Sequence, residues 1–125
     1  MTSGRRIAVA GSRHSVNELL VRWAFRELGI GVGDTIVHGA CAGADRMCAM
    51  VARSFGADTE AHPAEWKKYG KAAGPIRNRQ MLESGVNLLV AFPGGRGTNN
   101  AVMTARDLGI PVWDLRGVDE QEEVL

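Results

Sequence analysis

Short apolar runs alternate with longer amphipathic segments along the whole chain. The short runs have the length and composition of buried strands, and the longer segments repeat apolar residues at helical spacing. The expected strands cover residues 7–10, 35–38, 88–92 and 110–113, with a weaker strand at 59–62. The expected helices cover residues 16–28, 44–55, 76–83 and 99–108. This order predicts an α/β fold: a single Rossmann-like three-layer domain, with a parallel sheet of about five strands and helices on both faces.

Residues with known capping preferences predict where the helices begin and end. Ser15 is a candidate N-cap, and Gly29 is a candidate for the residue that ends the first helix. Pro75 stands where proline is favoured at the start of a helix. The segment 65–71 has mixed polarity, so we expect a short helical turn and loop there, which is the best candidate for a lid.

Composition limits the classes of protein to which the chain can belong. Its 125 residues and 45% hydrophobic content suit one domain, residues 1–116, followed by an acidic tail, residues 117–125. A formal net charge of +1 argues against generic nucleic-acid binding. The apolar run at 7–10 is too short for a signal peptide or a membrane span, so a cytoplasmic protein is expected. Cys41 and Cys48 lack the spacing of a zinc site, so we expect reduced thiols and no metal. We also expect no required cofactor.

Loops of small residues follow three of the expected strands. They cover residues 11–14, 38–45 and 93–98. Because the carboxyl ends of parallel strands meet at one edge of a sheet, these loops are expected to lie close together. Backbone N–H groups at glycine-rich turns and helix N-termini bind phosphate and other anions. A tight strand-to-helix turn is the structural alternative for each loop taken alone.

Sixteen residues in and around these loops are candidates for ligand binding. They are Gly11, Ser12, Arg13, His38, Gly39, Ala40, Gly43, Asp45, Trp66, Arg77, Asn78, Pro93, Gly94, Gly95, Gly97 and Thr98. Arg13 and Arg77 are expected near helix starts, where the helix dipole disfavours a cation unless an anion compensates it. The candidates therefore indicate a site for an anionic ligand.

Several of these side chains also have a purely structural explanation. The hydroxyls of Ser12 and Thr98 could cap a helix instead of contacting a phosphate. Asp45 is favoured by the dipole of the following helix, although it could also accept hydrogen bonds from ribose hydroxyls. His38 could be a structural group or an acid or base. Trp66 could stack on a base or hold its loop against the domain.

Five blocks in this order resemble the YspA-type (cpYpsA-related) branch of the SLOG superfamily. They cover residues 9–13, 38–45, 63–66, 70–78 and 92–98, and the resemblance runs from about residue 7 to residue 112. It implies a Rossmann-like protein that binds a nucleotide or a nucleotide-derived ligand, such as NAD or an ADP-ribose derivative. Members of this superfamily are frequent in bacteria and their phages.

The same superfamily includes the Lonely Guy (lysine-decarboxylase-like) phosphoribohydrolases, which release a base from a nucleoside monophosphate. Their Pro-Gly-Gly-x-Gly-Thr motif is followed by glutamates, whereas this chain has Asn99 and Asn100 there. An amide cannot carry the charge or the proton that cleavage of an N-glycosidic bond requires. Binding, as a sensor, carrier or sponge, is therefore the first hypothesis. Hydrolysis is the alternative, with Asp45, Glu65 and Arg77 as candidate catalytic residues.

Two helices carry more apolar residues than one sheet face needs to bury. These residues are Leu19, Trp23 and Phe25 on one helix, and Met47, Met50 and Val51 on the other. Related proteins pair through helices, so the resemblance implies a homodimer or a larger homo-oligomer, although core packing could also explain these side chains.

Overall fold

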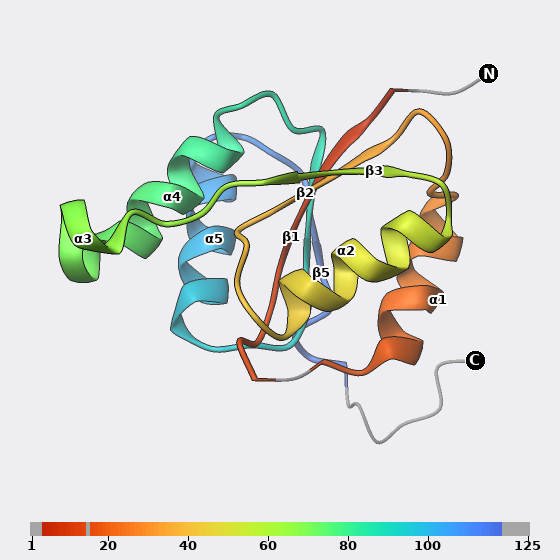
Figure 1. Ribbon diagram of the computed structural model, residues 1–125, viewed down its shortest axis with the longest axis horizontal. Helices are drawn as coiled ribbons and strands as arrows, with labels where there is room; N and C mark the ends of the chain where they lie inside the picture. Colours follow the sequence, from red (N-terminus) through yellow and green to blue (C-terminus); the bar gives the residue numbers. More distant parts are fainter. Residues whose placement is uncertain (1–3, 15, 119–125) are drawn as a thin grey trace.

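Five parallel strands form one sheet in the order β3-β2-β1-β4-β5 (Figure 1). The strands are β1 (Arg6–Ala10), β2 (Thr35–His38), β3 (Asp58–Ala61), β4 (Leu88–Ala91) and β5 (Val112–Asp114). The computed structural model describes residues 4–14 and 16–118. The strand order changes direction between β1 and β4, and in such sheets a ligand crevice lies beyond the carboxyl ends of the strands at this point.

Helices cover both faces of the sheet. They are α1 (Glu18–Leu28), α2 (Ala44–Ser54), α3 (Trp66–Tyr69), α4 (Ala73–Leu82) and α5 (Arg96–Asp107), with a 3-10 turn at Gly70–Ala72. In Figure 1, α1 and α2 lie on one side of the sheet and α4 and α5 on the other. Alternate residues of β1 accordingly enter two cores: Ile7 and Val9 pack with α1 and α2, and Ala8 packs with α4 and α5. The three-layer Rossmann-like fold is therefore confirmed.

The largest differences from the expected elements lie at helix starts. Asn17 caps α1, because its side chain accepts the N–H of Leu19 at 2.8 Å, whereas the expected cap, Ser15, lies outside the described residues. Gly29 ends α1 in the left-handed conformation, with φ 65°, as expected. Pro75 is the third residue of α4 and not its first, because the preceding 3-10 turn runs directly into the helix.

The start of α5 also differs from the expectation, and this difference changes the role of Thr98. The helix begins at Arg96, three residues before the expected start, with Gly95 as its N-cap. Thr98 is consequently part of the first turn of the helix and does not cap it. The glycine motif is thus partly helix and partly loop.

Core packing absorbs part of the apolar excess seen in the sequence. Phe25 and Val51 are fully buried, as the core-packing explanation of these side chains expects. The reason is that α1 and α2 share one face of the sheet and contribute to the same core. Leu19 and Met50 remain exposed.

Most of the expected acidic tail, from residue 119 onward, lies outside the described residues. Within residues 4–14 and 16–118, none of the helices is long and apolar enough to cross a membrane.

Candidate functional site

A cavity of about 360 Å³ lies beyond the carboxyl ends of β1, β2 and β4. This is the point where the strand order changes direction. Ten of the expected residues line it: Gly11, Ser12, Arg13, Gly39, Asp45, Arg77, Asn78, Gly95, Gly97 and Thr98. The three glycine-containing loops therefore meet at one edge of the sheet, and α4 supplies the remaining wall.

The loop between β4 and α5 supplies one end of the cavity. The N–H groups of the first turn of a helix have no partner within the helix, and here that turn contains Arg96, Gly97 and Thr98. Thr98 is 3% exposed, and its Oγ1 atom has no hydrogen-bond partner among the residues that the structure describes. Unsatisfied donors and a positive helix end are the features that attract an anion.

Gly94 lies behind this wall and does not line the cavity. A β-carbon at Gly94 would overlap Thr98 Oγ1 and lie 2.9 Å from the backbone nitrogen of Ser12. Its role is therefore close packing between the β1–α1 and β4–α5 loops. Pro93 is also outside the lining, and its carbonyl accepts the N–H of Ser12 at 3.0 Å.

Gly43 joins the β1–α1 loop to the start of α2. Its φ is 73°, and a β-carbon there would lie 2.6 and 2.7 Å from the C and O atoms of Arg13. The next residue, Ala44, donates its N–H to the Ser12 carbonyl at 2.8 Å. Gly43 is therefore a close-packing position and does not line the cavity.

The β2–α2 loop uses its own N–H groups internally. Asp45 Oδ2 accepts the N–H groups of Gly39 and Cys41, each at 3.2 Å. The N–H of Ala40 donates to His38 Nδ1 at 3.0 Å. These N–H groups are therefore not available to an anion, contrary to the expectation for this loop. His38 and Ala40 also lie outside the lining of the cavity.

Asp45 is the only carboxylate among the described lining residues. Burial raises the pKa of this carboxyl, while its two backbone hydrogen bonds and the charges of His38 and Arg77 oppose the rise. Oδ2 makes both recorded hydrogen bonds, and Oδ1 has none within the described chain. Glu65, the other acidic candidate, is exposed before α3 and does not line the cavity.

Arg77 is a buried cation, 8% exposed, that is held by neutral groups. Its Nε donates to Asn78 Oδ1 at 2.9 Å, and its Nη1 donates to the carbonyl of Gly39. Gly39 permits this contact because a β-carbon would collide with the guanidinium group. Arg77 makes none of the salt bridges found in the described part of the chain. A buried cation whose hydrogen bonds all go to neutral groups favours an anionic ligand.

Asn78 connects α4 to α5 across the cavity. Its Nδ2 donates to the carbonyl of Gly97 at 3.2 Å and to Asn100 Oδ1 at 3.0 Å. Asn99 accepts a hydrogen bond from Arg116 at 2.5 Å. Both amides that follow the glycine motif therefore make structural contacts.

Trp66 lies on α3 outside the cavity lining. The guanidinium carbon of Arg13 lies 5.3 Å from the centre of its ring. A β-carbon at Gly74 would lie 3.5 Å from Trp66 Cη2, so the ring also packs against α4. Trp66 is therefore connected to the cavity through Arg13.

Six lining residues were not among the candidates from the sequence: Val9, Ala10, His14, Cys41, Met81 and Arg96. His14, Cys41 and Arg96 lie within the three loops of small residues, so their place in these loops was the signal that could have identified them. The other three are apolar and have no chemical feature to distinguish them from core residues. Among the described residues, no group of three or more His, Cys, Asp or Glu side chains could hold a metal ion.

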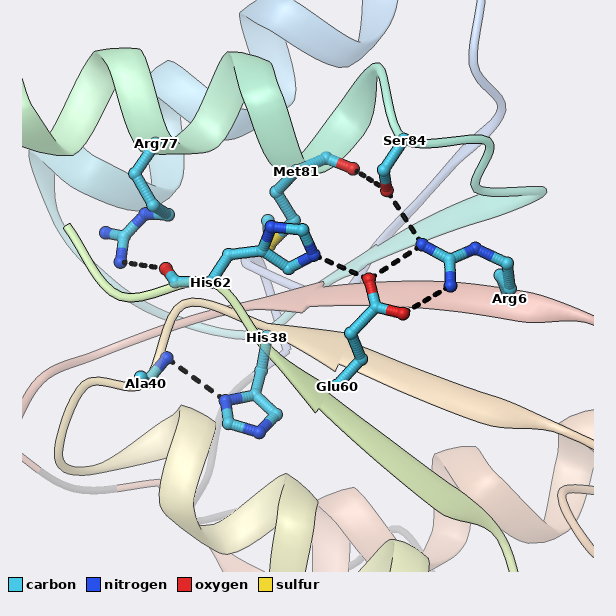
Figure 2. A network of polar contacts seen from close by, with 8 residues as sticks. All are labelled: Arg6, His38, Ala40, Glu60, His62, Arg77, Met81 and Ser84. Carbon is cyan, nitrogen blue, oxygen red and sulfur yellow. Dashed lines mark hydrogen bonds and ion pairs between the residues drawn. The ribbon is translucent and has the colours of Figure 1, made fainter.

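A second polar network connects β1, β3 and the end of α4 (Figure 2). Arg6 binds both carboxylate oxygens of Glu60, at 2.5 and 2.8 Å, and also donates to Ser84 Oγ at 2.8 Å. His62 Nε2 lies 2.6 Å from Glu60 Oε2. Hydrogen bonds from Arg6 and His62 lower the pKa of Glu60 to about 2. The carbonyl of His62 lies 3.5 Å from Arg77 Nη1, which connects this network to the cavity wall.

The fold and the cavity define an α/β protein of the Rossmann-like class, with a candidate binding site where the strand order changes direction. No protein-family model matches the chain. The Gene 61 protein of Mycobacterium phage D29 is 38% identical over 87 residues, which cover 64% of this chain and 70% of that protein. The chain therefore belongs to the family of the phage D29 Gene 61 protein.

Solved structures share the fold at low sequence identity. The X-ray structure of TM1055 matches with a TM-score of 0.66 and 17% identity, over 86% of this chain and 72% of that one. The C-terminal domain of PF1911 hydrogenase from Pyrococcus furiosus matches with a TM-score of 0.50 and 16% identity, over 91% and 93% of the two chains. At these identities the similarity shows the fold alone.

Proposed function

We propose that this protein binds a nucleotide or a nucleotide-derived ligand in the cavity between β1 and β4, where the strand order changes direction. The observation that carries the proposal is the charge of the cavity wall. Three arginines, Arg13, Arg77 and Arg96, line it with a single carboxylate, Asp45. None of these arginines forms a salt bridge within the described residues. Such a wall favours a ligand with a phosphate or a similar anionic group.

The two ends of the cavity suit different parts of such a ligand. The first turn of α5, with its N–H groups and the unpartnered Thr98 hydroxyl, suits the phosphate. Asp45 Oδ1 suits a donor such as a sugar hydroxyl. The volume of about 360 Å³ is near the lower end of the range for small-molecule sites, roughly 300–1,000 Å³. The sequence motifs support a place in the YspA-type branch of the SLOG superfamily.

A thermal-shift screen tests the proposal. The probes are adenosine monophosphate, ADP-ribose and NAD, with uncharged adenosine as the control. A ligand at one hundred times its Kd should stabilise the fold by about 2.7 kcal/mol. Thr98→Val, which keeps the shape of the side chain and removes the hydroxyl, should reduce the shift for the anionic probes. Equal responses to adenosine and to all three anionic probes, or no response at all, would contradict the proposal.

Hydrolysis of an N-glycosidic bond is the second candidate function, and Asp45 is the observation that favours it. This carboxyl lies on the cavity wall, and a raised pKa suits a general acid. Chromatographic detection of free base from nucleoside monophosphates or NAD tests this function. Turnover that is lost in Asp45→Asn, while the ligand still stabilises the variant, would make the protein an enzyme.

We also propose a cytoplasmic homodimer or larger homo-oligomer that acts as a sensor, carrier or sponge for the ligand. Leu19 on α1 and Met50 on α2 are exposed apolar side chains that support self-association. Light scattering of the chain and of Leu19→Glu tests this proposal, and a monomeric chain at all concentrations would contradict it.

A further inference from the structure

His38 lies at the end of β2, directly behind the loop that forms the β2 side of the cavity. Its ring nitrogen Nδ1 lies 3.0 Å from the backbone nitrogen of Ala40 (Figure 2). A backbone N–H can only donate, so Nδ1 must be the acceptor and cannot carry a proton. The ring is therefore neutral, with its proton on Nε2.

Ala40 is held in an unfavourable backbone conformation. Its φ is 60°, and it is the only residue other than glycine with a positive φ in the described chain. Left-handed backbone costs an alanine roughly 1 kcal/mol, so the surrounding contacts must hold it there. The hydrogen bond to His38 is the contact made by the Ala40 N–H itself.

The residues on both sides of Ala40 contact the charged groups of the cavity. The N–H groups of Gly39 and Cys41 both donate to Asp45, and the carbonyl of Gly39 accepts from Arg77. This loop therefore makes hydrogen bonds to both Asp45 and Arg77, which line the cavity. A change of the loop at Ala40 would alter these hydrogen bonds.

We propose that His38 is a positioning residue: its neutral ring holds the loop Gly39–Cys41, and protonation of the ring releases this loop and weakens ligand binding. A protonated ring would place the Nδ1–H against the N–H of Ala40, so that two donors face each other and the hydrogen bond is lost. The effect on binding rests on the proposed function, whereas the effect on the loop does not.

The groups around the His38 ring set the pH at which the ring is protonated. Burial is the main cause that lowers the pKa of His38 from its usual 6.5. The charge of Asp45 on α2 raises it, whereas Arg53 on α2 and His62 beyond β3 lower it. The loop should therefore keep its present form at neutral pH and change below pH 6.5.

Nuclear magnetic resonance of the full chain tests the positioning role without a ligand. We expect His38 to be neutral with its proton on Nε2 at pH 7.5. On acidification, the ring nitrogens of His38, the amide of Ala40 and the Nε–H of Arg77 should shift with one midpoint below pH 6.5. A proton on Nδ1 at pH 7.5, or a titration of His38 that leaves the Ala40 and Arg77 signals unchanged, would overturn the proposal.

Two substitutions separate the effect of the hydrogen-bond acceptor at position 38 from the effect of protonation of the ring. His38→Asn keeps an acceptor oxygen near the position of Nδ1 and cannot be protonated in this range, so the Ala40 and Arg77 signals should stay at their high-pH positions. His38→Leu removes the acceptor and should give the low-pH signals at every pH. His62→Gln, which keeps a polar partner for Glu60, is the matched control and should retain the titration. If His38→Leu does not fold, His38→Asn still tests the proposal. A titration of the Ala40 and Arg77 signals that persists in His38→Asn would overturn it.

Sulfate is the probe for the effect on binding, because its charge is constant between pH 5 and pH 8. One unit below the midpoint, about one tenth of the rings are neutral, so apparent sulfate affinity should fall about tenfold. His38→Asn should remove this loss of affinity. A loss of affinity on acidification that survives in His38→Asn would overturn the regulatory part of the proposal. Absence of sulfate binding at any pH would count against the anion site, while the resonance titration still tests His38.

Discussion

Arg13 stacks on Trp66, with its guanidinium carbon 5.3 Å from the centre of the indole ring. This contact joins the β1–α1 loop to α3 and holds a cavity-lining cation against an aromatic face. A phosphate in the cavity would compete with the ring for Arg13. We therefore predict that the fluorescence of Trp66 shifts to longer wavelength when an anion binds, because the ring loses its partner and gains solvent.

A titration with sulfate, followed by tryptophan emission, measures this effect. The shift should be lost in Trp66→Phe and retained in Trp113→Phe, since Trp113 packs against Trp23 on the other side of the sheet. An unchanged shift in Trp66→Phe would show that Arg13 does not move between the ring and the anion.

Two glycines of the β4–α5 segment should respond differently to alanine. At Gly94 a β-carbon would overlap Thr98 Oγ1 and approach the backbone of Gly11 and Ser12, so Gly94→Ala should destabilise the fold by about 2–3 kcal/mol. Gly97 is helical and has open space around its Cα. Gly97→Ala should therefore be neutral or stabilising by up to about 1 kcal/mol. Urea unfolding of both variants measures the difference, and equal losses would contradict the packing role of Gly94.

The Arg6–Glu60 pair should contribute to stability in a defined pH window. The folded-state pKa of Glu60 is about 2, below its usual 4.5, so its contribution is present above pH 4.5 and disappears as the pH falls to about 2. Because Glu60 is partly exposed, Glu60→Gln should cost only about 1 kcal/mol at pH 7. The cost should vanish near pH 2 in urea unfolding. Glu83→Gln, which breaks a longer and more exposed pair with Arg79, is the control and should cost less at pH 7.

Asp45 should show the opposite pH dependence. Its pKa is raised from the usual 3.8, so its contribution to stability is present below pH 3.8 and is lost as the pH rises through the raised value. Asp45→Asn keeps an acceptor for the Gly39 and Cys41 N–H groups and should be as stable as the parent chain at pH 7, or more stable. Asp45→Ala leaves both N–H groups without an acceptor and should cost about 2–4 kcal/mol. Equal unfolding midpoints for the two variants in urea would contradict this role.

The sequence predicted the sheet well because alternating strands and helices leave few possible topologies. It predicted the helix starts less well, since these depend on contacts between distant segments. The helix α5 begins at Arg96, with Gly95 as its N-cap. The preceding residue, Gly94, packs closely against the β1–α1 loop, and this contact fixes where the β4–α5 loop ends. Similarly, α4 begins before Pro75 because a 3-10 turn precedes it. Neither feature has a local signal of the kind that Gly29 provides.

The candidate site was predicted at the level of loops but not at the level of individual groups. From the sequence, the glycines at 39 and 94 have the same apparent role, namely to present N–H groups to an anion. In the structure, Gly39 makes room for the Arg77 guanidinium and Gly94 makes room for the Thr98 hydroxyl. Likewise, Trp66 was a candidate for stacking on a base, and in the structure the guanidinium group of Arg13 lies over its ring. Close approach between distant residues decides these roles, and no local pattern records it.

The internal hydrogen bonds of the β2–α2 loop make the two ends of the cavity chemically unlike. One end has free N–H donors at the first turn of α5, and the other has already given its N–H donors to Asp45 and His38. If both loops offered free N–H groups, an anionic ligand could bind in two opposite orientations with similar affinity. Because only one of the two loops offers free N–H groups, the cavity distinguishes the direction of a ligand as well as its charge.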